Sequence, residues 1–396
     1  MNALLLCALL APGAPRAYTI TMTAPAHDVA WAPMHVTVPA APGFHPVLRR
    51  RGRVVASQTR TVPDGQEVTW IAEGLPAGKT ERLELRIERG VPRAAAPGDW
   101  TAVARGADTV ITCGGKPVAT YDATTGPNKP YLHPLFGPDG QRMVRRFPLE
   151  RVAGETNDHP HHRGLWFTHG DLNGQDYWSE GKNAASTRQR AAEQLAAGPL
   201  SAYLRTATDW VSREGKRSAT DIREIRFYRR SDAIVIDFEV ELRASDGEIR
   251  LGDTKEGSFG LRLPDTMRLT GGDGHILNSD GVADGKTWGR AANWVDYTGT
   301  VEGKRAGVAI LCGPGSFRAP TTWHVRDYGL FAANPFGLHD FDPKLPRGAG
   351  DHTLAAGSAM RFAYRVILHR DGPEDAAIAR GWADYAAPPT AVVTAR

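Results

Sequence analysis

The chain has 396 residues, with 48 Lys and Arg against 44 Asp and Glu, and a formal net charge of +4 at pH 7. This length is enough for one large all-β domain, or for a large domain with a small companion, each with a buried core. The small positive excess is scattered along the chain, so composition gives no support for nucleic-acid binding.

The beginning of the chain resembles a signal peptide. Residues 3–11 form a short apolar run, small residues follow near Ala17, and no basic residue precedes the run. We therefore expect residues 1–18 to be a signal peptide and the protein to be periplasmic or secreted. No stretch approaches the roughly eighteen apolar residues of a membrane helix, so no membrane span is expected. Cys113 and Cys312 lie far apart, and we expect two buried thiols rather than a disulfide.

The next segment, residues 19–104, contains short alternating runs separated by Pro and Gly, such as Met34–Val38 and Arg82–Ile87. This pattern predicts a small β-sandwich. Residues 105–386 open with a hairpin around Gly114-Gly115 and include Ile234–Leu242, whose apolar residues alternate with acidic ones. We predict a large antiparallel β-sandwich here, with short helices at 190–197 and 374–386, and a disordered tail at 387–396.

The stretch 157–178 is the richest in chemistry and holds four of the 13 histidines. If residues 158–162 run extended, His159 and His161 share one face while Asp158 and His162 share the other. Ordinary hydrogen-bonded histidines in a polar loop remain an alternative. Clustered imidazoles beside Arg163 and several aromatic residues nevertheless favour a cleft that binds a sugar or another polyol, because buried ring nitrogens without partners are costly.

Three later clusters accompany this stretch. A predicted strand at 253–260 carries Glu256, a candidate base whose alternative is a surface ion pair with Lys255. The aromatic residues around Asp296 are read either as a sugar platform or as core. In an extended strand His324 and Arg326 share one face with Tyr328 behind them, which suits an acid beside a clamp for an anion or hydroxyl group.

These stretches together resemble the PmoA-like family over roughly residues 105–370. The matching segments are Tyr131–Leu135, Asp158–Trp166, Thr254–Gly260, Trp323–Leu330 and Ala333–Gly337. The resemblance implies a galactose-mutarotase-like β-supersandwich, a fold used by aldose epimerases and by carbohydrate hydrolases and lyases. The family name alludes to methane oxygenase, an integral membrane protein, and the expected absence of a membrane helix argues against that activity.

Three functions follow as hypotheses. The first is a carbohydrate-active hydrolase, lyase or epimerase acting on a pyranose or glycoside, with His161 or His324 as acid and Glu256 as base. The second is a metal-dependent enzyme in which His159 and His161, with His169 or His133, bind Zn, Cu or Fe. The third is a non-catalytic sugar-binding protein. The oligomeric state is left open.

The hypotheses share one structural expectation. Residues 133, 159, 161–163, 169, 256, 324 and 326 should converge in one cleft of the large domain. The predicted contacts to a small-molecule or oligosaccharide substrate are His133, Arg163, His169, Trp166, Trp178, Arg326, Tyr328, Asn334 and Asp296.

Overall fold

The computed structural model describes residues 17–40, 42–90, 93, 96–370 and 375–396. The predicted signal peptide therefore lies almost wholly outside the described residues. The chain forms two compact units. The small unit contains the residues up to 100 together with 196–201 and 379–396, and the large unit contains 101–195 and 202–378.

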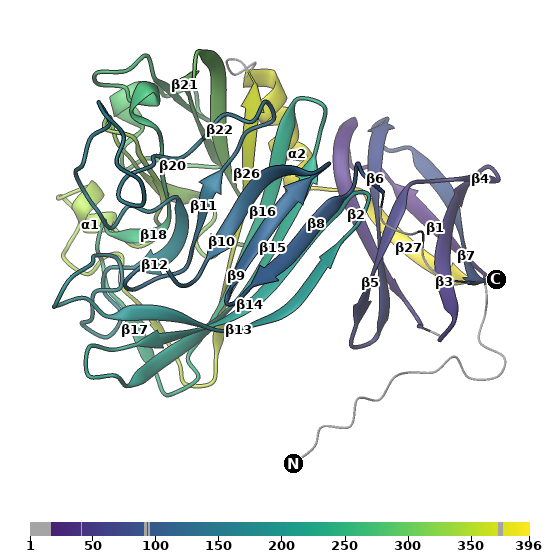
Figure 1. Ribbon diagram of the computed structural model, residues 1–396, viewed down its shortest axis with the longest axis horizontal. Coiled ribbons are helices and arrows are strands. Elements are labelled where there is room, and N and C mark those ends of the chain that lie inside the picture. Colours follow the sequence, from purple (N-terminus) through teal and green to yellow (C-terminus); the bar gives the residue numbers. More distant parts are fainter. Residues whose placement is uncertain (1–16, 41, 91–92, 94–95, 371–374) are drawn as a thin grey trace. The chain divides into compact units, whose positions relative to one another are not determined.

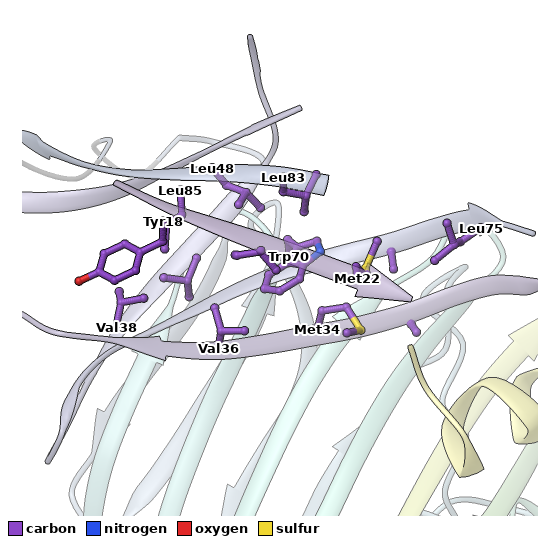
Figure 2. Packing of buried hydrophobic residues seen from close by; sticks show 14 of the residues in the cluster. Tyr18, Met22, Met34, Val36, Val38, Leu48, Trp70, Leu75, Leu83 and Leu85 are labelled. Atoms are coloured by element: carbon purple, nitrogen blue, oxygen red, sulfur yellow. The ribbon is translucent and has the colours of Figure 1, made fainter. Parts of the chain in front are cut away.

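The small unit is built from two antiparallel sheets (Figure 1). In spatial order their strands are β27 (Thr390–Ala395), β1 (Ala17–Thr23), β7 (Thr80–Arg89), β3 (Phe44–Arg50) and β4 (Arg53–Val54) in one sheet, and β2 (Val29–Val38), β6 (Gly65–Leu75) and β5 (Ser57–Val62) in the other. Every second residue of β1 is buried, so Ile20 and Met22 reach a core centred on Trp70 (Figure 2). The burial of these apolar side chains stabilises the unit.

The C-terminal segment is a strand, and the predicted disordered tail was therefore wrong for residues 390–395. β27 pairs with β1 from Thr390 opposite Thr23 to Ala395 opposite Tyr18. Val393 packs, half-buried, against the core. The alternating pattern of this segment fits a strand, and its pairing supplies backbone partners that β1 would otherwise lack on that edge.

The large unit contains two broad sheets. Within the described residues the nine-stranded sheet has the order β20 (Ala291–Ala292), β23 (Thr321–Val325), β24 (Leu330–Ala333), β18 (Gly257–Arg262), β12 (Leu165–His169), β11 (Tyr131–Leu135), β10 (Lys116–Asp122), β9 (Asp108–Cys113), β8 (Trp100–Arg105). The eight-stranded sheet has the order β13 (Ser186–Ala197), β14 (Ser201–Val211), β15 (Arg217–Arg229), β16 (Ala233–Arg243), β26 (Ala359–Arg370), β22 (Lys304–Cys312), β21 (Trp294–Val301), β19 (His275–Asn278).

Short elements complete the unit. They are the strand pair β17 (Ile249–Leu251) and β25 (His352–Leu354), the 3₁₀ turns Asp265–Met267 and Asp284–Thr287, and the helix α1 (Leu338–Phe341); α2 (Asp375–Ala386) continues into the small unit.

Aromatic side chains join the two broad sheets. The Phe259 ring of β18 stacks on the Tyr364 ring of β26 with centroids 4.6 Å apart, and Phe167 of β12 packs 5.0 Å from Phe362. Such pairs contribute about 0.5–1.5 kcal/mol beyond their burial. These contacts define an inner face of the nine-stranded sheet. The fold class is confirmed as a large antiparallel β-sandwich with a smaller N-terminal one.

Most predicted elements of the large unit are present. The Gly-Gly hairpin is formed by β9 and β10, the alternating strand at 234–242 is β16, and the C-terminal helix is α2. The predicted helix at 190–197 was wrong, because these residues belong to β13. β13 is an edge strand, and residues 190–197, which are exposed or half-buried and include Arg190 and Glu193, suit such an edge.

Two further expectations concern the cysteines and the membrane. Cys113 and Cys312 are both buried and free, as predicted. Among the described residues, no helix combines the length and apolar character that crossing a membrane requires.

Candidate active site

A row of direct cross-strand neighbours crosses five strands of the nine-stranded sheet. It runs through Tyr131, Trp166, Gly260, Ala332 and His324. Successive strand residues point to opposite faces, so this outer row lies on the face opposite the inner aromatic contacts. The two small residues in the middle, Gly260 and Ala332, separate the indole of Trp166 on one side from the imidazole of His324 on the other.

Gly260 fits this row because two indoles lie over it. A Cβ at this position would lie 2.6 Å from a ring atom of Trp166 and 2.8 Å from one of Trp178, which is closer than van der Waals contact allows. Both predicted aromatic site residues are therefore brought together on the outer face, and both are fully buried. They form the floor on which the histidines pack.

We expect Gly260→Ala to destabilise the large unit by about 1–3 kcal/mol, because overpacking forces both indoles to move. Thermal unfolding measures this change. Gly285→Ala is the matched control, since no described atom lies within 4 Å of its added Cβ. Equal melting temperatures for the two variants would contradict the packing argument.

The histidine segment 158–162 is a turn, so the prediction of an extended strand was wrong. His159 has a positive φ of 46°, and the His162 amide donates a hydrogen bond to the His159 carbonyl at 3.0 Å. Pro160 sits within this turn and has no amide hydrogen to satisfy. The turn brings His159, His161 and His162 close together instead of separating them onto two faces.

The histidine rings of this turn pack against residues on the outer face of the nine-stranded sheet. His159 stacks on Tyr328 with centroids 5.0 Å apart and on His162 at 4.8 Å, and His162 stacks on Trp166 at 5.4 Å. His161 meets His162 edge-on at 4.4 Å. We call Tyr328 and the three histidines of the turn the histidine cluster.

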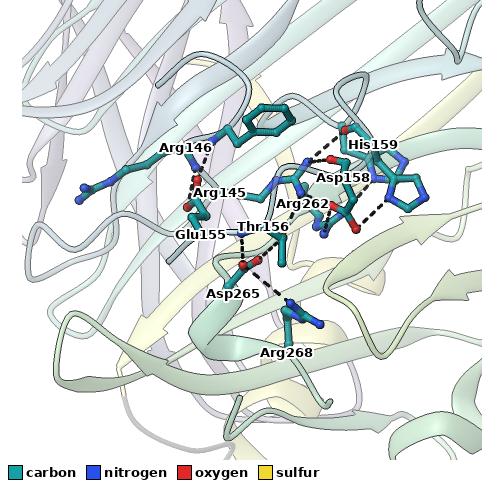
Figure 3. Close-up of polar contacts among 11 residues, drawn as sticks. Arg145, Arg146, Glu155, Thr156, Asp158, His159, Arg262, Asp265 and Arg268 are labelled. Carbon is teal, nitrogen blue, oxygen red and sulfur yellow. Dashed lines mark hydrogen bonds and ion pairs between the residues drawn. The ribbon is translucent and has the colours of Figure 1, made fainter. Parts of the chain in front are cut away.

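Two buried arginines anchor the turn through one carboxylate (Figure 3). Asp158 accepts hydrogen bonds from Arg145 and, at 2.8 Å, from Arg262, and both arginine side chains are completely buried. Arg145 also donates to the carbonyls of residues 158 and 159. Partial burial raises the pKa of Asp158, but the two guanidinium groups outweigh this effect and lower it to about 2.

A second charged group flanks the cluster. Arg163 forms a bidentate pair with Glu180, at 2.7 and 2.9 Å, and the buried Lys129 lies 3.6 Å from the same carboxylate. The Lys129 ammonium also donates to the Trp178 carbonyl at 2.6 Å. Arg163 is thus engaged within the protein, and its predicted role as a free substrate contact would require Glu180 to release it.

His324 and Glu256 complete the site from the far end of the outer row. The His324 Nδ1 atom lies 2.8 Å from the Lys255 carbonyl, while Nε2 is buried without a partner among the described residues. Glu256 precedes β18 in a loop rather than within a strand, and its carboxylate forms the 2.7 Å ion pair with Lys255 that the sequence offered as an alternative. Glu256 also acts electrostatically on His161 and His324, so both face the same negative charge.

Burial controls the protonation of the imidazoles. It lowers the pKa of both His161 and His324 to about 4, although the charge of Glu256 works in the opposite direction. Both rings are therefore neutral at pH 7. A neutral imidazole has a lone pair that can accept a proton, whereas an imidazolium would be needed for the acids predicted from the sequence, so base roles fit these rings better.

The same shifts predict acid lability of the large unit. Four histidines, at positions 133, 161, 169 and 324, each have a pKa of about 4, and burial is the largest effect that lowers it. An unfolded histidine titrates near 6.5. Between about pH 6.5 and 4 the unfolded chain therefore binds protons that the folded chain does not, and stability falls as the pH falls through this window.

Each such histidine contributes at most about 1.4 kcal/mol per pH unit. His369 opposes the trend, because Asp296 outweighs burial and raises its pKa. We expect the melting temperature to drop steeply from pH 6.5 to 4. A flat profile over this range, measured by calorimetry, would contradict the burial of neutral imidazoles.

Three predicted site residues lie elsewhere, so the expected convergence was wrong for His169 and the predicted substrate contacts were wrong for Asn334 and Asp296. His169 shares the inner face with Phe167, and its Nε2 lies 2.9 Å from the Gly252 carbonyl. Asn334 is fully buried and binds the Thr254 carbonyl and two backbone amides, which holds two loops together. Asp296 belongs to the eight-stranded sheet and pairs with His369 at 3.0 Å.

His133 occupies an intermediate position. It belongs to β11, two residues after Tyr131, but is 5% exposed, and its Nε2 has no partner within the described part of the chain. Its electrostatic neighbours are Arg142 and Glu150 rather than the histidine cluster. His133 therefore supports the sheet beside the site instead of facing a substrate.

The predicted metal ligands do not assemble. His159 and His161 are adjacent at 5.7 Å between centroids, but His169 lies on the other face of the sheet. No group of three His, Cys, Asp or Glu residues in the described ranges is placed to hold a metal ion. The donor set proposed from the sequence therefore does not fit Zn, Cu or Fe.

A cavity of about 570 Å³ opens beside the histidine cluster. Its lining residues are Leu269, Thr270, Gly285, Trp288, Val325, Arg326 and Asp327. Arg326 connects it to the cluster, because its guanidinium lies 5.9 Å from the Trp288 ring and 5.4 Å from the Tyr328 ring. Trp288 in turn meets the His324 ring edge-on at 6.5 Å.

Sequence reasoning missed four charged members of this site, namely Arg145, Arg262, Lys129 and Glu180. Only Arg262 carried a recognisable signal, because it follows Ser258 and Gly260 at the two-residue spacing of one strand face.

Comparison with known proteins gives a family but no activity. The chain is similar to the crystal structure of an alpha-mannosidase from Enterococcus faecalis V583, with 12% identity and a TM-score of 0.44 over 98% of this chain and 47% of that chain. It thus spans about half the length of that protein. No curated protein sequence matches the chain. Residues 108–383 match the model of a family of unknown function, DUF6807. Since the match covers most of the chain and the whole site, the protein belongs to the DUF6807 family.

Proposed function

We propose that the protein is a carbohydrate-active enzyme that acts on a pyranose or glycoside by acid–base catalysis, as a hydrolase, lyase or epimerase. The observation that carries this proposal is the His324 imidazole. It is neutral at pH 7, and its Nδ1 lies 2.8 Å from the Lys255 carbonyl. A carbonyl only accepts hydrogen bonds, so Nδ1 holds the ring proton and Nε2 keeps a free lone pair.

His324 then serves as the base. Its Nε2 accepts a proton from a sugar hydroxyl, a sugar C–H or a water molecule, and the ring becomes an imidazolium. The negative charge of Glu256, which already favours protonated His324, stabilises this form. The proton returns to the product or to the leaving group. Glu256 thus acts as an electrostatic partner of the base, in place of its predicted role as the base itself.

Aromatic surfaces suit the sugar. Trp288 meets the His324 ring, and Tyr328 lies on the other side of Arg326; rings of this kind pack against the C–H faces of pyranoses while hydroxyl groups bond to polar neighbours. The combination of flat rings, a neutral imidazole and a nearby carboxylate supports sugar chemistry more strongly than binding alone.

A substrate screen tests the proposal. The full chain is incubated with a panel of glycosides, oligosaccharides and free aldoses, and products are followed by NMR and mass spectrometry. Hydrolysis adds water, elimination produces an unsaturated sugar, and epimerisation keeps the mass while changing the ring proton couplings. Binding without turnover would support the sugar-binding alternative, and absence of both would overturn the proposal.

A further inference from the structure

We propose that the substrate carries an anionic group, a carboxylate or sulfate on one of its sugar units, and that Arg326 binds this group at the cavity beside Trp288. This inference rests on the proposed function and adds to it the class of substrate. Three observations carry it: the lack of an acidic partner for Arg326, its support by two rings and the adjoining cavity.

Arg326 differs from every other cation of the site. Arg145 and Arg262 share Asp158, and Arg163 is held by Glu180. For Arg326, no ion pair with any carboxylate of the described residues is formed, and its guanidinium lies over the faces of Trp288 and Tyr328. Stacking on rings leaves the edge of a guanidinium, with its N–H donors, open to another group.

The two rings also hold this guanidinium in place. Arg326 is half-buried, and cation–π contacts with two aromatic rings restrict its long side chain before a ligand arrives. A pre-positioned guanidinium binds a carboxylate or sulfate with two parallel hydrogen bonds. Such an arrangement loses little side-chain entropy on binding.

The cavity provides the space for the sugar unit. Besides Arg326 and Trp288 it offers the Thr270 hydroxyl and Asp327. The Asp327 carboxylate accepts a hydrogen bond from Thr270 at 3.2 Å, so it is directed to this hydroxyl rather than to Arg326. The indole supplies a flat apolar surface next to the cation, which suits a ring that carries a charged substituent.

Calorimetric titration of the full chain tests the inference. The probes are oligosaccharide pools from pectin, alginate and hyaluronan, the same pools after reduction of their carboxylates to alcohols, and a sulfated neutral oligosaccharide. We expect at least one acidic or sulfated probe to bind about tenfold more tightly than its neutral counterpart, which is the effect of one charge-assisted contact. Comparison of the acidic and sulfated arms identifies the anion.

Variants assign the effect to Arg326. Arg326→Gln should reduce the affinity for the charged probe to that for the neutral probe, and Arg326→Lys should retain part of the preference. Arg305→Gln is the matched control, because Arg305 forms an exposed pair with Asp273 in the same unit. This control should keep the full preference.

The other possible results of the titrations each contradict a specific proposal. Equal binding of charged and neutral sugars by the wild type, or an unchanged preference in Arg326→Gln, would overturn the anion inference and leave the proposed function intact. Competition by free acetate or sulfate at equal concentration would assign the site to a small anion instead of a sugar. Failure of every pool to bind or react would overturn both proposals.

Discussion

His324→Asn is expected to lower kcat/KM on the sugar found in the screen by about 10²–10⁴-fold, the usual contribution of a general base. The asparagine amide can still donate to the Lys255 carbonyl, so the loop keeps its contact while the free lone pair at Nε2 disappears. For the wild type, kcat/KM should be constant near neutral pH and should fall as the pH drops through about 4, because protonation removes the base.

Kinetics and thermal unfolding together separate chemistry from structure. His275→Ala is the control, since His275 lies on β19 of the eight-stranded sheet, is exposed and pairs with Asp284 of the 3₁₀ turn Asp284–Thr287. It should leave kcat/KM unchanged. An active His324→Asn variant would exclude His324 as the base, and an inactive variant with a strongly lowered melting temperature would point to a structural role.

Asp158→Ala should destabilise the large unit by about 2–4 kcal/mol, because it leaves two completely buried guanidinium groups without their carboxylate. The value lies below that for a fully buried pair, since the Asp158 side chain itself is 40% exposed and water can replace part of the interaction. Urea unfolding followed by tryptophan fluorescence measures the change.

Two further variants make the comparison specific. Asp246→Ala removes the carboxylate of an exposed pair with Arg217 and should change stability by no more than about 0.5 kcal/mol. Adding Arg262→Met to Asp158→Ala removes one uncompensated charge and should recover part of the loss. Equal effects of the two aspartate substitutions would show that the buried arginines do not depend on Asp158.

Local alternation made much of the fold predictable. β16 alternates apolar and acidic residues because one face is buried and the other is not, and this regularity is visible in sequence. The same reasoning could have excluded His169. Along β12 it shares a face with Leu165 and Phe167, whereas Trp166 faces the histidine cluster.

The histidine turn could not be predicted in this way. Its positive φ at His159 depends on hydrogen bonds from Arg145 to the carbonyls of residues 158 and 159, and Arg145 comes from a separate segment. The pairing of Asp296 with His369 likewise depends on which sheet each strand joins. These are long-range contacts, and they cannot be predicted from the alternation of residues within one strand.

The position of β27 has a consequence for the order of assembly during synthesis. Among the described residues β1 is the first strand and β27 the last, yet they are neighbours, and the Arg396 amide donates to the Ala17 carbonyl at 2.9 Å. β1 is synthesised well before β27, so one edge of β1 stays unsatisfied until residues 390–395 have been made, and residues 202–378 of the large unit are made before this edge is covered. Because residues 17 and 396 are neighbours, a short linker between them and new ends in an exposed loop would give a circular permutant of the part that the structure describes.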